Sequence, residues 1–288
     1  MTPALLGIVA ALSWGAHDFI GRFATRSVGQ FATTLGVMLT GAIVLTVIVL
    51  AFGGGATWPG SGMVAICAFA GGSYALATLC LFSAYRIGSL SIVSPLVGAY
   101  PALVIVWNVA LGSRPSAWAW AAMLAVMAGT AIVSAAGTHH EEQGHVERGR
   151  LKPMLVFSGL SAVCYAVSVI AGQTAAPVIG EMQTTWIARA FAVATLLPLL
   201  VNPDYRRRAP MIWWPAIMAM GLFDTLAMIS VFKAGQMPEA EIAAVAGSSF
   251  GGVVALLGRF FFKEPVTTLQ WGGIGLIFMG TGVLTLGW

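Results

Sequence analysis

Four ionisable residues lie inside otherwise apolar stretches of the sequence, namely His17, Asp18, Arg189 and Asp224. A charge in apolar surroundings is costly, so such residues often bind a solute or an ion, or relay protons. Arg189 and Asp224 occupy neighbouring apolar stretches and could form an ion pair, which would serve either coupling or helix packing alone. Asp18 could pair with Arg22, four residues along the same helix.

Aromatic residues in the middle of apolar stretches predict a second kind of chemistry, the stacking of a small amphiphilic solute. His17 lies three residues after Trp14, so both rings project from one face of a helix. Core packing explains each residue equally well on its own, but together they predict a cavity lined by rings with few charges. The candidate substrate-binding residues are Trp14, His17, Tyr74, Tyr100, Tyr165 and Trp186.

No ATP-binding or metalloprotease motif accompanies these residues, because the sequence contains neither a Walker loop nor His-Glu-x-x-His. Three cysteines fall in apolar stretches without metal-ligand spacing, and three histidines of a hydrophilic segment lack a partner cluster. We therefore expect no catalytic residues, no metal site and no cofactor. The sequence predicts a protein that is not an enzyme.

The elements that position these residues are predicted by composition to be transmembrane helices. Of 288 residues, 58% are hydrophobic and 8% are charged, against about a quarter charged in a soluble domain. The pI near 9.2 does not indicate a nucleic-acid partner, because the basic residues stand singly at the ends of apolar blocks. The blocks predict an all-α polytopic membrane protein whose ten transmembrane helices cover about 3–24, 31–52, 62–85, 90–111, 116–136, 153–175, 182–201, 211–232, 240–261 and 266–287.

The chain also shows signs of an internal duplication. At an offset of 151 positions, Trp14-Gly15 aligns with Tyr165-Ala166 and Gly129-Thr130 with Gly280-Thr281. Chance similarity between Gly- and Ala-rich helices is the alternative. Five helices per repeat place the halves in opposite orientations, which is typical of alternating-access transporters. The expected organisation is a first five-helix repeat at 1–137, a hydrophilic linker at 138–152 and a second repeat at 153–288.

Together, these features resemble the drug/metabolite transporter superfamily, and in particular its EamA-type family. The resemblance rests on the two five-helix halves, the SWGAHDF segment of the first helix, a Pro-bearing fourth helix and the Pro…Gly…Gly-Thr close of each half. It covers nearly the whole chain, and within the family the chain resembles aromatic amino-acid exporters of the YddG type. One departure is Arg114-Pro115, where the second half has the acidic Glu264-Pro265. The resemblance therefore implies no role for a matched pair of acidic residues.

The resemblance implies a secondary transporter or facilitator that exports amino acids, aromatic or large neutral, or related small metabolites. Arg189 is the one basic residue placed at depth, which disfavours phosphorylated solutes. A proton-coupled exporter of cationic drugs that uses Asp224 is the alternative within transport. An intramembrane enzyme and a helical scaffold are the alternatives of another class. We expect a multi-pass protein of the bacterial inner membrane that functions as a monomer, with the lipid bilayer and a small solute as its partners.

Two further expectations concern motion and orientation. Pro95 and Pro101 in span four, and Gly247 and Gly251 in span nine, predict hinges that bend to close opposite gates. Eleven basic residues fall on one side of the predicted topology and two on the other, so the positive-inside rule favours both termini outside the cytoplasm.

Overall fold

The computed structural model describes residues 1–52, 59–87, 93, 96–137, 148–206, 210–263 and 266–286. Over these ranges the chain is helical, and no strand occurs in them. The first half contains α1 (Pro3–Val28), α2 (Gln30–Phe52), α3 (Ser61–Ile87), α5 (Tyr100–Ala110) and α6 (Ala117–Gly137). The second half contains α7 (Arg148–Ile179), α8 (Glu181–Leu196), α9 (Trp214–Ala234), α10 (Glu241–Gly247), α11 (Phe250–Phe262) and α12 (Thr268–Leu286). Three short 3-10 helices, η2 (Leu197–Val201), η3 (Pro203–Arg206) and η4 (Met211–Trp213), join α8 to α9.

The helices have the length and the surface of membrane spans. Eight helical segments in the described ranges are long and apolar enough to cross a bilayer, and two shorter apolar helices cover Leu96–Ala110 and Ala117–Val133. Large apolar side chains lie on the outside, among them Leu50 and Phe260, each 79% exposed. Such a surface is unfavourable in water and suits a lipid environment. The chain is therefore a multi-pass membrane protein.

Three helix boundaries bear on the predicted organisation. Residues 138–147 of the predicted linker lie outside the described residues, whereas 148–152 already form the start of α7. The ninth predicted span consists of two helices, α10 and α11, rather than one. The fourth predicted span is interrupted at Ala99, and α5 begins at the next residue.

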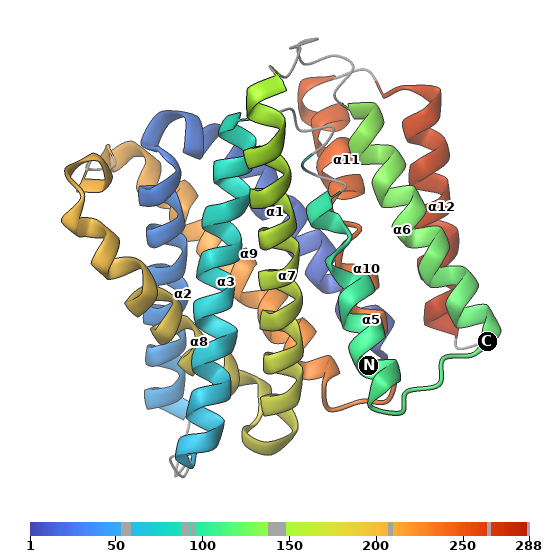
Figure 1. Ribbon diagram of the computed structural model, residues 1–288, viewed down its shortest axis with the longest axis horizontal. Coiled ribbons are helices and arrows are strands. Elements are labelled where there is room, and N and C mark those ends of the chain that lie inside the picture. The colour runs from blue at the N-terminus through green and yellow to red at the C-terminus, as the bar shows by residue number, and fades with distance from the viewer. Residues whose placement is uncertain are drawn as a thin grey trace.

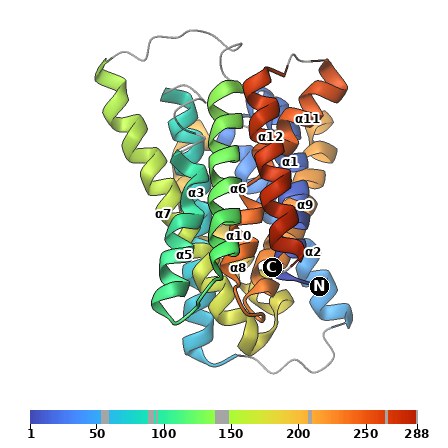
Figure 2. The ribbon, with the colours of Figure 1, turned by 90° about the vertical axis from the view of Figure 1, so that its right-hand side faces the viewer.

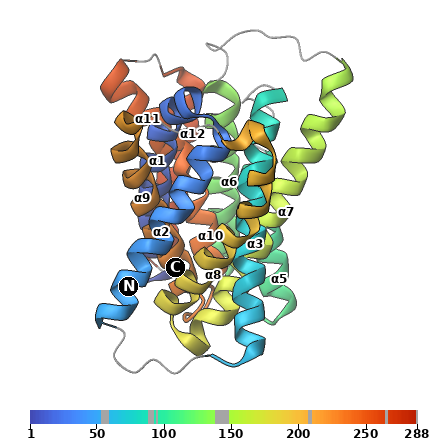
Figure 3. The same ribbon diagram turned by 90° about the vertical axis from the view of Figure 1, so that its left-hand side faces the viewer.

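The packing of the helices is reciprocal between the two halves. Helix α1 of the first half packs on α9 of the second half, and α7 of the second half packs on α3 of the first half. Likewise α2 contacts α9 while α8 contacts α3. Both termini lie in the lower part of the bundle, whereas α7 begins at its upper end (Figures 1 and 2). The contact between α2 and α8 lies on the side of the bundle shown in Figure 3.

Small residues permit the close helix contacts, as expected where helices cannot rely on water to drive them together. Helix α6 packs on α12 through Gly129 and Gly273. A Cβ atom on Gly129 would lie 2.6 Å from the carbonyl oxygen of Gly273, so a side chain does not fit there at the present helix spacing.

Candidate functional site

A buried ion pair between α8 and α9 forms the centre of the candidate site. The guanidinium Nη2 of Arg189 lies 2.5 Å from Oδ2 of Asp224. The side chains are 3% and 1% exposed, respectively. The predicted pairing of these two residues is therefore present, and it lies in the interior of the bundle rather than on its surface.

The second carboxylate oxygen of Asp224 is satisfied by two aromatic donors. The indole Nε1 of Trp14 on α1 donates a hydrogen bond of 3.1 Å to Oδ1, and the hydroxyl of Tyr74 on α3 donates to the same atom. Asp224 thus receives one cation and two hydrogen bonds. Because its partners come from α1, α3 and α8, this one carboxylate joins elements of both halves of the chain.

Arg189 is enclosed on its other sides. Its guanidinium carbon lies 5.1 Å from the centroid of the Tyr74 ring, a cation–π geometry. Its Nη1 donates to the sulfur of Met38 at 2.7 Å. Gly41 on α2 leaves room for this side chain, since a Cβ at Gly41 would lie 3.3 Å from Nε of Arg189 and would overlap the hydroxyl of Thr225.

A close contact between α3 and α8 holds Tyr74 beneath Arg189. A Cβ on Gly71 would overlap the backbone carbonyl of Ala188, so the two helix backbones approach as closely as glycine permits. Gly71 stands three residues before Tyr74, and Ala188 immediately precedes Arg189. The glycine therefore sets the distance between the two functional side chains.

Three of the predicted aromatic residues continue from the ion pair as a chain of rings. Tyr74 and Tyr165 meet edge to face with centroids 5.5 Å apart, and Tyr165 and Tyr100 lie 6.0 Å apart. The hydroxyl of Tyr165 is 3.3 Å from that of Thr78. The Tyr100 hydroxyl donates to the carbonyl of Ala244 at 3.2 Å. Trp14 packs in the same two groups of apolar residues as these tyrosines, so four predicted residues belong to one aromatic cluster.

His17 and Trp186 lie outside this cluster. Nδ1 of His17 lies 2.8 Å from Oδ1 of its neighbour Asp18, although His17 remains near enough to Asp224 and Arg189 for their charges to act on it. The side chain of Arg22, the other predicted partner of Asp18, lies outside the described residues. Trp186 donates to the Thr46 hydroxyl at 2.8 Å and packs with a separate group of apolar residues.

The two interrupted spans break at equivalent positions. Ala99 precedes α5 with φ −79° and ψ −2°, and Ser249 precedes α11 with φ −74° and ψ 3°. The two residues are 150 positions apart, which agrees with the offset of the duplication. Paired interruptions of this kind are a common feature of transporter binding sites.

The predicted hinge residues stand close to these breaks. Pro101 lies in the first turn of α5, where proline begins a helix without removing an internal hydrogen bond. It therefore stands beside the break rather than in the middle of a helix, and the hinge stays a prediction. Gly247 ends α10 and Gly251 is the second residue of α11. Pro95 lies outside the described residues.

Trp14 connects the ion pair to the second break. Its ring lies edge-on to Phe250, with centroids 6.5 Å apart. A Cβ on Gly247 would lie 3.2 Å from the same ring. The residue that donates to Asp224 therefore also contacts both sides of the interruption between α10 and α11.

The segment Gly247–Gly251 reads GSSFG and so also matches the letters of the Gly-x-Ser-x-Gly motif of hydrolases. That motif functions on a sharp turn from a strand to a helix, with a histidine as base. Here the segment joins two helices, and the Ser249 hydroxyl donates to the carbonyl of Ala246 at 2.6 Å. The structural context of the motif is therefore missing.

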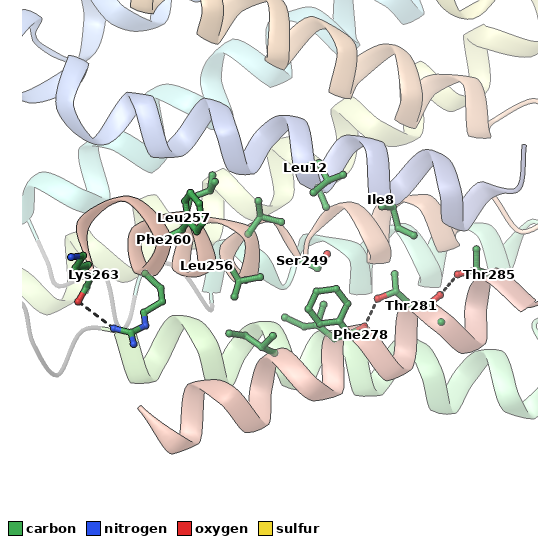
Figure 4. Close-up of a pocket in the computed structure, with 17 residues that line it drawn as sticks. Ile8, Leu12, Ser249, Leu256, Leu257, Phe260, Lys263, Phe278, Thr281 and Thr285 are labelled. Carbon is green, nitrogen blue, oxygen red and sulfur yellow. Dashed lines mark hydrogen bonds between the residues drawn. The ribbon is translucent and has the colours of Figure 1, made fainter. Parts of the chain in front are cut away.

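Two cavities lie away from the ion pair. The larger, of about 950 Å³, is a mostly aliphatic groove between α1, α11 and α12 that Arg259 also lines, with Lys263 at one end (Figure 4). The smaller, of about 340 Å³, has Asn108, Ser113, Gln173 and Glu241 in its walls. Neither includes a predicted substrate-binding residue.

Glu241 was missed by the sequence analysis. It stands at the start of the ninth predicted span, where an acidic residue suggests a helix end at the membrane surface, yet it is fully buried. Its position inside the predicted span was the available signal. Across the described ranges, no three His, Cys, Asp or Glu side chains come together as a metal site.

Comparison with known proteins adds a family and a fold. The model of the EamA-like transporter family matches the chain twice, over residues 1–135 and 152–286. A solved structure titled "Crystal structure of protein" superimposes with a TM-score of 0.81 at 20% sequence identity, covering 99% of this chain and 98% of that one. At that identity the likeness concerns the fold alone. No curated protein matched this chain.

Proposed function

Since the chain belongs to the EamA-like transporter family and is a membrane transporter of small solutes, we propose that it exports aromatic or large neutral amino acids. It does so as a secondary transporter or facilitator, in the manner of YddG-type exporters. The proposed binding site is the ion pair of Arg189 and Asp224 together with the adjoining rings of Trp14, Tyr74 and Tyr165.

The observation that carries this proposal is a buried pair of opposite charges beside a group of aromatic rings. An amino acid is a zwitterion, so its carboxylate can pair with Arg189 while its ammonium group pairs with Asp224. The exchange leaves no uncompensated charge in the interior, which is the expensive outcome for a buried pair. A large apolar side chain can stack on the neighbouring rings, at about 0.5–1.5 kcal/mol for each aromatic contact beyond area burial.

The same geometry weighs against the alternative of cationic-drug export through Asp224. Exchange of a proton for a cation requires a carboxylate that is available to either, whereas Asp224 is held by Arg189, Trp14 and Tyr74. The family match favours transport over an enzyme or a helical scaffold.

We further propose ten spans in two inverted five-helix repeats that alternate access around the ion pair in a monomer of the bacterial inner membrane. The reciprocal packing of α1 on α9 and of α7 on α3 supports a two-fold relation between the halves. The equivalent breaks before α5 and α11 are the proposed gates. Cysteine labelling tests the topology: probes at position 145 and at the C-terminus should react from opposite sides of the membrane. Reaction from the same side contradicts ten spans.

Transport in proteoliposomes tests the substrate. Vesicles with the protein should carry phenylalanine, tryptophan and leucine faster than empty vesicles. Trp14→Phe, which removes the indole donor to Asp224, should reduce the rate sharply at normal expression. Trp186→Phe is a matched control, because it also removes an indole donor but lies outside the aromatic cluster. Uptake of a quaternary amine without uptake of these amino acids overturns the proposal in favour of drug export.

A further inference from the structure

Gln173 on α7 presents a buried oxygen that has no hydrogen-bond partner. Its amide nitrogen donates to the carbonyls of Val231 and Ala240, at 3.1 and 3.0 Å. These two acceptors fix the orientation of the amide, because the reversed orientation would place oxygen against oxygen. Its Oε1 is therefore a true acceptor, and it has no hydrogen-bond partner among the described residues. The side chain is 7% exposed, so water does not satisfy it freely.

A second oxygen without a hydrogen-bond partner belongs to Glu241, the first residue of α10. The residue is fully buried, and the Ser113 hydroxyl donates to its Oε1. Its Oε2 has no hydrogen-bond partner, and no cation pairs with this carboxylate within the described ranges. A buried carboxylate with a single neutral donor is strongly destabilised, because burial removes its hydration without replacing it.

Both residues line the same cavity of about 340 Å³. Its walls come from the C-terminal part of α5, from α7, and from the segment between α9 and α10. Apolar side chains complete it, among them Trp107, Leu111 and Ile170. The C-terminal end of α5 and the segment between α9 and α10 lie in the lower part of the bundle, toward both termini (Figures 1 and 2).

We propose that this cavity binds an organic ammonium group, held by Oε2 of Glu241 and Oε1 of Gln173. The two oxygens accept hydrogen bonds from the N–H groups, and the carboxylate balances the positive charge. The apolar walls take the organic part of the ligand.

Charge and size favour an amine over a metal ion. Glu241 is the fully buried carboxylate in the walls of this cavity and balances a single positive charge, and the described residues contain no cluster of three metal-ligating side chains. The cavity volume falls at the lower end of the range for small organic ligands and is much larger than one ion requires. Two acceptors without partners suit the N–H donors of an ammonium group, whereas a hard cation typically requires about six oxygen ligands.

The location gives such binding a structural consequence. Ser113 follows α5, and Glu241 begins α10, so the ligand contacts the ends of both interrupted spans. Glu239, in the turn before α10, has a φ of 55°, a left-handed conformation that is rare for this residue type. A bound cation would therefore steady a strained turn and link the two halves at one end of the bundle.

Thermal unfolding of the full chain in detergent tests this site directly. The probes are ethylammonium, sodium and choline chlorides at equal ionic strength. Ethylammonium should raise the unfolding temperature of the wild type in a saturable way, because a ligand that binds the folded state stabilises it. Choline carries the same charge without N–H donors and should not. In Glu241→Gln, the affinity for ethylammonium should fall roughly a hundredfold, as expected when a buried charge loses its charged partner.

Glu239→Gln is the matched control, since it removes the same charge from the partly exposed wall of the same cavity. It should keep the response to ethylammonium. Equal loss in both variants would show that general negative potential, and not the Glu241 and Gln173 pair, attracts the cation. A wild type that responds to none of the salts, or to sodium alone, overturns the assignment without reference to either variant. The assay measures binding and not transport, so its outcome is independent of the substrate proposed above.

Discussion

Two carboxylates are buried among the described residues, Asp224 and Glu241, and they differ in how completely their surroundings satisfy them. Asp224 has a guanidinium partner at 2.5 Å and hydrogen bonds from Trp14 and Tyr74. Glu241 has one hydroxyl donor and an oxygen without a partner. Both lie at helix contacts between the two halves of the chain.

The difference separates a charge that stabilises the fold from one that is left open to a ligand. Removing one member of a buried pair typically costs about 3–5 kcal/mol, because the other charge remains without compensation. Asp224 can therefore exchange its partner only for a group of the same charge, such as the ammonium of a zwitterion whose carboxylate takes up Arg189. Glu241 can accept a cation without first losing one.

The largest expected effect comes from breaking the satisfied pair. Arg189→Met should lower the free energy of unfolding by about 3–5 kcal/mol, since Asp224 would be left charged in the interior. Chemical unfolding of the purified protein in detergent measures this loss. The double variant Arg189→Met/Asp224→Leu should recover most of it, because an apolar pair of similar volume needs no compensation. A single variant as stable as the wild type would contradict the comparison.

Removing one hydrogen bond from Asp224 should have the next largest effect. Tyr74→Phe deletes the hydroxyl that donates to the carboxylate and should cost about 1.5–3 kcal/mol, the range for hydrogen bonds to charged groups. Tyr100→Phe is the control, because its hydroxyl donates to the neutral carbonyl of Ala244 and should cost about 0.5–1.5 kcal/mol. Unfolding curves recorded side by side check the order of the two losses. Equal losses would mean that the charge of Asp224 does not strengthen its hydrogen bond with Tyr74.

Widening the contact between α3 and α8 should act on the same region through the backbone. Gly71→Ala places a methyl group against the carbonyl of Ala188 and should cost about 1–3 kcal/mol as overpacking. Gly72→Ala is the neighbouring control: its Cβ meets only the Thr195 hydroxyl, at 3.5 Å, an ordinary contact. It should be neutral or stabilising by up to about 1 kcal/mol through helix propensity. Thermal unfolding of both variants separates the two effects, and similar losses would exclude the close approach as their cause.

No loss of stability is expected at Glu241. Glu241→Gln keeps the shape of the side chain and removes a buried charge that has no cationic partner among the described residues, so the free energy of unfolding should stay the same or rise in ligand-free buffer. The same unfolding assay, with Asp224→Asn alongside, checks this difference. A loss at Glu241 as large as that at Asp224 would show that both carboxylates are structural.

Much of the fold could be predicted from the sequence, because the cost of burying polar groups in lipid constrains the sequence directly. Long apolar blocks gave the helical membrane architecture, and the family model matches over two ranges separated by the hydrophilic segment. The offset of about 150 positions also relates the breaks at Ala99 and Ser249. The sequence suggested the pairing of Arg189 with Asp224 for a simple reason: isolated charges in neighbouring spans have few other partners.

The tertiary structure decided which side chains share a site. In lipid the outward face of a helix is as apolar as its inward face, so periodicity does not reveal where Trp186 or Tyr74 points. The structure placed Trp14 and Tyr74 on Asp224 but moved Trp186 to another cluster. Glu241 and Gln173 stand 68 positions apart on different helices and share a cavity only through the packing of α5, α7 and α10. Whether a buried oxygen has a partner depends on atoms brought together across the bundle, and no local pattern in the sequence records that.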